Sequence, residues 1–100
     1  MTPYRFHPGA EEEFAETASF YEAHVAGLGA SFVLEVERIV TAIREHPDLG
    51  SPIGGKTRRA QVHGFPYTLF YRRLADHILI LAIAHQHRRP GYGRNRATAR

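Results

Sequence analysis

Residues 58–85 read RRAQVHGFPYTLFYRRLADHILILAIAH, and this stretch decides the fold. Apolar and polar side chains alternate over 58–63, which is typical of a strand with one wet face. The sequence GFP that follows predicts a turn, Thr68–Leu74 a second strand, and Ala75–Asp76 a tight turn before a third strand over His77–His85. Three strands joined by short connections predict an antiparallel meander.

The third strand differs from the other two because Ile78–Ala84 is apolar throughout. A strand without polar alternation is buried on both faces. One face of the sheet would then meet helices, and the other would be covered by the C-terminal tail or by a partner. The same apolar run is far shorter than the roughly 18 residues of a membrane span.

The first half of the chain predicts a short strand and two helices. Tyr4–His7 is the strand candidate, and Pro8-Gly9 ends it. Apolar residues at helical spacing mark one helix at Ala10, Phe14, Ala18 and Tyr21, and a second at Phe32, Val36, Ile39, Val40 and Ile43. The sequence GLG at 27–29 separates them, Ser31 lies near the start of the second, and His46-Pro47 stops it. Two such helices joined by a few residues predict an antiparallel helical hairpin.

The remaining segments complete the expected organisation. Glu11, Glu12 and Glu13 suit the positive end of the first helix, and we expect them to be solvated. The segment 47–56, PDLGSPIGGK, predicts a loop, and 92–100 a basic tail that frays. The 100 residues fit a single domain of the α+β class: an N-terminal strand, a helical hairpin and a three-stranded antiparallel meander.

The composition excludes several classes of protein. Hydrophobic residues make up 43% and charged residues 23% of the chain, a balance typical of globular rather than disordered proteins. There is no cysteine, which excludes a disulfide scaffold and a cysteine-ligated metal site. The N-terminus has no basic segment followed by an apolar one, so we expect no secretory signal, no membrane partner and a cytoplasmic location.

Charge is divided unequally along the chain. Residues 1–50 hold three basic and nine acidic side chains, whereas 51–100 hold ten basic side chains and one acidic, Asp76. Six arginines form pairs on or just after the predicted strands: Arg58, Arg59, Arg72, Arg73, Arg88 and Arg89. Neighbouring strands lie about 4.8 Å apart, so one member of each pair can join a phosphate-binding site on a given face. The alternative is a solvated sheet edge that charge protects from aggregation.

Histidines and aromatic residues give two further candidate sites. His85 and His87 share a face if the third strand continues, and two histidines can bind a metal or transfer a proton. A zinc site needs a third protein ligand, which we cannot place nearby, so the alternative is a hydrogen-bonded His85 beside an exposed His87. Phe65 and Tyr71 fit core packing, whereas Tyr92 in the basic tail is the better candidate for stacking on a base.

Taken in order, the motifs resemble the RelE/ParE superfamily of bacterial type II toxin–antitoxin toxins, often described as plasmid stabilisation proteins. The matching stretches are YRFHPGAEEE (4–13), GLGASFVLEVERI (27–39), HPDLGSPI (46–53), RRAQVHGFPYTLFYR (58–72) and ILILAIAHQHRRPGY (78–92). The expected order of elements agrees with the fold of that superfamily. One departure is Gly93, which stands where the family pattern commonly has tryptophan.

The resemblance implies one of two activities, and neither needs a metal or another cofactor. ParE-like members bind DNA gyrase and block replication without catalytic residues; the long hairpin and the HPDLGSPI and FPY motifs favour this branch. RelE-like members are ribosome-dependent mRNA endoribonucleases. In that branch the matching catalytic positions are Arg59, Arg72, Arg88, Tyr92 and His85. The chain is an enzyme only in the second case.

Both branches imply a cognate antitoxin whose C-terminal segment wraps the toxin in a hetero-oligomer. Its carboxylates would meet a partner-binding set: Arg58, Arg59, Tyr71, Arg73 and Arg89. Two alternatives stay open. The chain could be a module that binds nucleic acid through arginines and aromatic residues, or an inactive homologue that only titrates antitoxin, which Gly93 leaves open.

Overall fold

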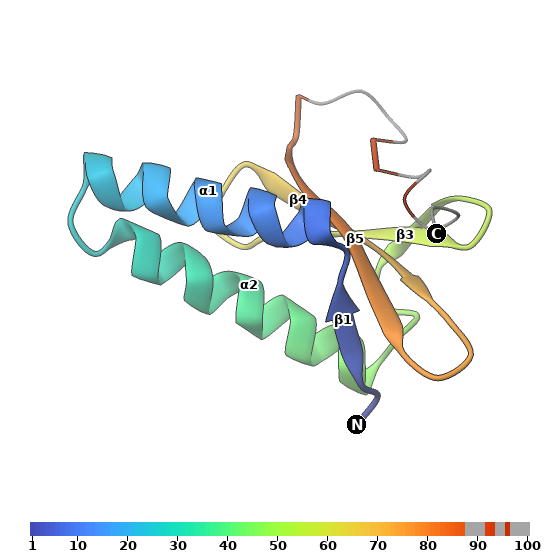
Figure 1. Cartoon of the computed structure of the whole chain (residues 1–100). Helices are drawn as coiled ribbons and strands as arrows, with labels where there is room; N and C mark the ends of the chain where they lie inside the picture. Colours follow the sequence, from blue (N-terminus) through green and yellow to red (C-terminus); the bar gives the residue numbers. More distant parts are fainter. Residues whose placement is uncertain (88–91, 94–95, 97–100) are drawn as a thin grey trace.

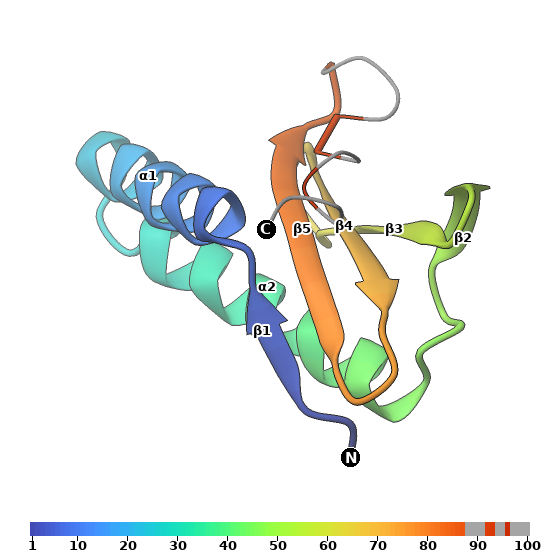
Figure 2. The same ribbon diagram turned by 45° about the vertical axis from the view of Figure 1, so that its right-hand side comes forward.

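The structure, a computed structural model, describes residues 1–87, 92–93 and 96. Its elements follow the chain in the order β1 (Tyr4–Phe6), α1 (Pro8–His24), α2 (Leu28–Glu45), β2 (Ser51–Gly54), β3 (Thr57–Gln61), β4 (Tyr67–Arg73) and β5 (Ile78–His85). Within the described residues both helices lie on one side of a five-stranded sheet, as Figure 1 and the turned view in Figure 2 show. The α+β class, the N-terminal strand, the helical hairpin and the meander are therefore confirmed.

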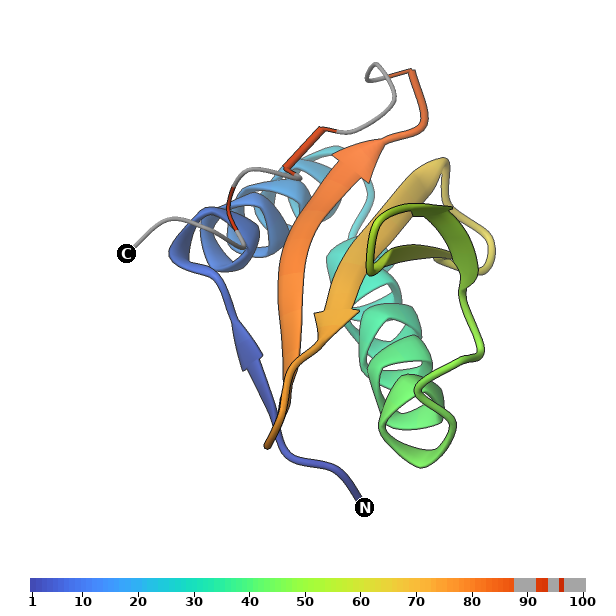
Figure 3. The same ribbon diagram turned by 90° about the vertical axis from the view of Figure 1, so that its right-hand side faces the viewer.

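The sheet brings the first strand of the chain beside the last one. Its strand order is β1-β5-β4-β3-β2, and Figure 3 looks onto the sheet with the helices behind it. The four strands β2 to β5 pair antiparallel, whereas β1 pairs parallel with β5, with Tyr4 opposite Ile78 and Phe6 opposite Ile80. The N-terminal segment therefore lies beside the last strand of the meander.

The prediction of a loop over 47–56 was wrong in part. Residues Ser51–Gly54 form β2, an edge strand that pairs with β3, with Pro52 opposite Arg58. Proline is tolerated on edge strands, where an outward N–H is not needed. Gly54 ends the strand with a φ of 128°, a conformation that glycine adopts at no steric cost. The proline and glycine content thus reflects a short, irregular edge strand as well as a loop.

A single glutamate closes the helical hairpin. The carboxylate of Glu22 accepts hydrogen bonds from the backbone N–H groups of Gly27 (2.8 Å) and Gly29 (2.9 Å). These groups lie at the start of α2, where N–H groups have no partner within the helix. The hydrogen bonds, that of Gly27 foremost, lower the pKa of Glu22. With this support α2 begins at Leu28, before Ser31. In the described part of the chain, neither helix combines the length and apolar character of a bilayer-crossing segment.

The main core lies between the hairpin and the sheet, and both predicted helical stripes contribute to it. Phe32 of α2 lies at its centre with no exposed surface. Its ring centroid is 5.1 to 6.1 Å from those of Phe14, Tyr21, Phe65 and Tyr67. These aromatic contacts connect both helices to β4 and the turn before it.

A second, smaller core lies on the opposite face of the sheet. Its buried residues are Phe70, Leu81, Ala82 and Ala84. Ile53 of β2 and Tyr92 of the tail pack against this cluster. Both faces of β5 are therefore buried, as its apolar run predicts, and the tail contributes to the cover of the second face.

Candidate functional site

The arginine pairs of β3 and β4 are divided between the two faces of the sheet. Arg58 lies opposite Tyr71 across the antiparallel strands, and directly opposed residues share a face. Tyr71 belongs to the main core, so Arg58 lies on the helix-facing side, as does Arg73, two residues beyond Tyr71. Arg59 and Arg72 lie on the opposite face. The structure therefore divides the four arginines into two separate sets.

Arg58 and Tyr71 tie the segment after α2 to the sheet. The Tyr71 hydroxyl accepts a hydrogen bond from Gly50 N and donates one to Pro47 O, each at 2.8 Å, and burial raises its pKa. Arg58 donates to Gly50 O at 2.6 Å and to Asp48 O at 3.2 Å, and lies 3.6 Å from the Asp48 carboxylate. Because Tyr71 has no exposed surface, its core packing is confirmed. It cannot touch a partner directly, which corrects its place in the partner-binding set.

The opposite face carries a polar cavity of about 360 Å³ beside Arg59, which is exposed. Four polar residues share this cavity: Ser51, Gln61, Thr68 and Gln86. Arg72, on the same face, donates to Thr57 Oγ1 at 3.1 Å, while its Nε is buried without a partner among the described residues. The third predicted pair, Arg88 and Arg89, lies outside the described residues.

His85 ends β5 and is half-buried. Its ring meets the edge of the Tyr67 ring at 5.3 Å and stacks on the His87 ring at 4.8 Å. The backbone N–H of His87 donates to His85 Nδ1 at 3.2 Å, and His87 itself is exposed. Of the two interpretations of this pair, the structure agrees with the hydrogen-bonded His85. No cluster of three or more potential metal ligands occurs among the described His, Asp and Glu residues.

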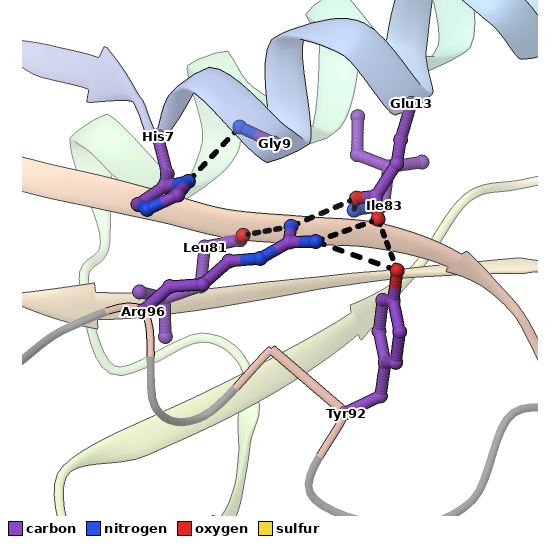
Figure 4. A network of polar contacts seen from close by, with 7 residues as sticks. All are labelled: His7, Gly9, Glu13, Leu81, Ile83, Tyr92 and Arg96. Carbon is purple, nitrogen blue, oxygen red and sulfur yellow. Dashed lines mark hydrogen bonds and ion pairs between the residues drawn. The ribbon is translucent and has the colours of Figure 1, made fainter. Parts of the chain in front are cut away.

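Tyr92 is fixed by a network around the Glu13 carboxylate (Figure 4). Glu13 Oε2 accepts hydrogen bonds from the Tyr92 hydroxyl and from Arg96 Nη2, the latter at 3.0 Å. Glu13 Oε1 accepts from Ile83 N at 3.0 Å and from Arg96 Nη1 at 3.1 Å. Arg96 Nη1 also donates to Leu81 O at 2.8 Å, and its bond to Glu13 raises the pKa of Arg96. One carboxylate thus joins α1, β5 and the tail.

The network lies where β1 leaves the edge of β5 uncovered. The pairing of β1 ends with Phe6 opposite Ile80. Further along β5, Leu81 O accepts a hydrogen bond from Arg96 and Ile83 N donates one to Glu13. Side chains therefore take over the hydrogen bonding that a longer β1 would supply, and they protect the strand edge.

The expectation that Glu13 would be solvated was wrong. Glu13 lies one turn after Ala10, which is fully buried, so it points toward the inner side of α1. The helix comes so close to the tail that a Cβ on Gly9 would lie 2.6 Å from Arg96 Cζ. The spacing of three residues between Ala10 and Glu13 indicates an inward-facing side chain. Acidic residues are also favoured at the start of any helix, so the sequence explained Glu13 equally well as a solvated residue.

The catalytic set implied by a RelE-like activity is not gathered in one cavity among the described residues. Tyr92 and His85 line a cavity of about 130 Å³ that also contains Glu13 and Glu16. Arg59 lines a separate polar cavity that neither Tyr92 nor His85 lines. Two carboxylates beside the tyrosine disfavour a phosphate group, because like charges repel.

Gly93, which follows Tyr92, is the departure from the family pattern, and its surroundings explain why glycine stands there. Its φ is 80°, and a Cβ built on it would lie 2.8 Å from the Cβ of Ala82. A larger residue would strain the backbone and overlap the second core. The path of this tail therefore requires glycine where a tryptophan is commonly found.

We expect Gly93→Ala to lower the free energy of unfolding by about 2 kcal/mol, from backbone strain and overpacking together. Gly64→Ala is the matched control, because Gly64 also has a φ of 80° but no atom within 4 Å of its Cβ position. That variant should lose only about 1 kcal/mol. Urea unfolding of the full chain measures both. Equal losses would show that the tail is not packed on Ala82.

Comparison with known proteins relates the chain to a sequence family and to solved structures. Residues 4–90 match the family described as "ParE toxin of type II toxin-antitoxin system, parDE". A solved structure described as "Chromosomal ParDE TA system from P. aeruginosa" has a TM-score of 0.71 and 16% sequence identity to this chain. The alignment covers 85% of this chain and 96% of that chain, and at this identity it establishes a shared fold. No curated protein matches the chain in sequence.

Proposed function

The chain belongs to the ParE toxin family of type II toxin–antitoxin systems, and on that premise we propose that it stops bacterial growth by acting on DNA gyrase. A cognate antitoxin would neutralise it in a hetero-oligomer. The proposed target places the protein in the cytoplasm. Membership of this family supports the proposal that the chain is a toxin with an antitoxin partner. The choice of gyrase over the ribosome is our own inference.

The choice of gyrase over the ribosome rests on the contacts of the Tyr92 hydroxyl. A RelE-like nuclease would need this hydroxyl free beside basic groups that receive the scissile phosphate. Here the hydroxyl donates to Glu13, and the cavity beside it contains a second carboxylate, Glu16. The one described guanidinium nearby, Arg96, is itself paired with Glu13. These contacts favour a toxin that acts by binding a protein.

The test is induced expression in a bacterial host, with incorporation of labelled thymidine and methionine followed in parallel during the first minutes. We expect DNA synthesis to fall before translation. Co-expression of the gene next to that of the toxin, as a candidate antitoxin, should restore growth. Purified chain added to purified gyrase should inhibit supercoiling of plasmid DNA.

The variant Tyr92→Phe separates the two activities. It removes a hydroxyl that a nuclease would need but keeps the aromatic ring on the second core. We expect Tyr92→Phe to keep the fall in DNA synthesis. If translation falls first and Tyr92→Phe abolishes that fall, the gyrase proposal is wrong and the nuclease is supported. If neither synthesis falls, the chain is an inactive homologue or a nucleic-acid-binding module.

A further inference from the structure

We propose that His7 makes the attachment of the C-terminal tail to α1 dependent on pH. His7 immediately precedes α1, and its ring Nδ1 accepts a hydrogen bond from Gly9 N at 2.9 Å. Pro8 has no backbone N–H, so the N–H of Gly9 is the first one of the helix that needs a partner. Nδ1 accepts this bond only while it carries no proton. Protonation of Nδ1 therefore removes the side-chain cap of α1.

The tail packs against the turn that this cap holds (Figure 4). A Cβ on Gly9 would lie 2.6 Å from Arg96 Cζ, so the guanidinium of Arg96 rests directly on the backbone of the first turn. The same guanidinium donates to both oxygens of Glu13, one turn further along α1. A change in the first turn therefore moves the surface on which Arg96 lies.

A protonated His7 would also add a positive charge to an end of α1 that already holds one. The start of the helix is the positive end of its dipole, and Arg96 lies against it. Arg5 of β1 points to the same side as His7, because side chains two residues apart in an extended segment share a face. His7 N donates to Ile80 O at 2.8 Å, and residues 80–84 of β5 are all apolar. The strand and the tail therefore offer no negative charge to a protonated ring among the described residues.

The carboxylates at the start of α1 do not replace the cap. Glu11 and Glu12 are exposed, so water and salt screen their charges. The two oxygens of Glu13 already accept four hydrogen bonds from β5 and the tail. In the part of the chain that the structure describes, the N–H of Gly9 donates to His7 and to none of these carboxylates.

Acid should therefore loosen the tail. The cap is intact while His7 is neutral, and it is lost as pH falls through the range in which histidine gains its proton. Fraying of the first turn then withdraws the backbone on which Arg96 lies, and Tyr92, which is bound to the same carboxylate, is released with it. Because Tyr92 packs on the second core, its release uncovers apolar surface on that face of the sheet. This pH dependence is the same whether the target is gyrase or the ribosome.

The test is hydrogen exchange of the Ile83 amide, measured by NMR on the full chain at about pH 7.5 and about pH 5.5. Ile83 N donates to Glu13 Oε1 at 3.0 Å, so its protection shows how often the network around Glu13 is open. Protection factors are compared, since they correct for the pH dependence of exchange itself. We expect the protection of Ile83 to be about fivefold lower at the acidic pH, the usual effect of losing one helix cap. Gly50 N, which donates to the Tyr71 hydroxyl, is the internal control and should keep its protection.

Three variants assign the effect to His7. His7→Asn keeps a side chain that caps helices but does not titrate, so Ile83 should be equally protected at both pH values. His7→Ala has no cap, so the protection of Ile83 should be low at both. His87→Asn is the matched control, because His87 is an exposed histidine outside the cap. It should lose protection in acid as the unchanged chain does.

A pH switch at His7 is contradicted if the protection of Ile83 is the same at the two pH values. It is also contradicted if His7→Asn keeps the change, which would assign the change to another titrating group such as Glu13 or His85. A parallel loss of protection at Gly50 would contradict it as well, since the whole chain would then be unfolding in acid. Circular dichroism checks that each variant is folded, and His7→Ser, a second cap that does not titrate, replaces His7→Asn if that variant does not fold.

Discussion

Replacing Phe32 with alanine is expected to lower the free energy of unfolding by about 3–5 kcal/mol. Phe32 has no exposed surface and contacts the rings of Phe14, Tyr21, Phe65 and Tyr67. Alanine would leave a cavity where the two helices meet the sheet. Four rings held in place by other contacts can close that cavity only in part, so both burial and packing are lost.

Phe20→Ala is the matched control for this prediction. Phe20 lies on α1 with 55% of its surface exposed, so its loss should change the free energy of unfolding by about 0.5 kcal/mol or less. Urea unfolding of the full chain, followed by far-UV circular dichroism, compares the two variants. Similar losses would mean that the aromatic cluster does not hold the hairpin on the sheet.

The parts of the fold that the sequence predicts are those with a local period. The helical stripes through Phe32 and the alternation over residues 58–63 arise from which side chains face one core, so each pattern lies within a single segment. The parallel pairing of β1 with β5 has no such local signal, because it joins Tyr4 to Ile78. The edge strand β2 was missed because it is short and contains Pro52.

The candidate site was hard to predict for the same reason: its contacts join residues that are far apart in the sequence. Tyr92 was a candidate from its place in the tail, but the carboxylate that binds it is 79 residues away. Spacing along α1 places Glu13 on the inner side of the helix without showing which strand edge or tail residue it meets. Tyr71 was assigned to partner binding beside its arginine neighbours, and only the fold shows that its hydroxyl is used by Pro47 and Gly50.

Replacing Glu13 with alanine is expected to lower the free energy of unfolding by about 2–4 kcal/mol. The change removes the acceptor for Ile83 N and leaves the Arg96 guanidinium, whose side chain is 23% exposed, without its carboxylate. A buried N–H without a partner costs about 1–3 kcal/mol, and hydrogen bonds to charged groups contribute about 1.5–3 kcal/mol. The partial exposure of Arg96 keeps the total below a simple sum of these contributions.

Glu12→Ala is the control, since Glu12 is the exposed neighbour of Glu13 and has no hydrogen bond or ion pair with the described tail residues 92, 93 and 96. It should change the free energy of unfolding by about 0.5 kcal/mol or less. Limited trypsin digestion is a second measurement: Glu13→Ala should speed cleavage in the arginine-rich tail, whereas Glu12→Ala should not. If the two variants behave alike, Glu13 does not hold the tail. Tyr92 would then be free to approach Arg59 and Arg72, which lie on the same face of the sheet as the second core that its ring packs against. The main argument for gyrase over the ribosome would then be lost.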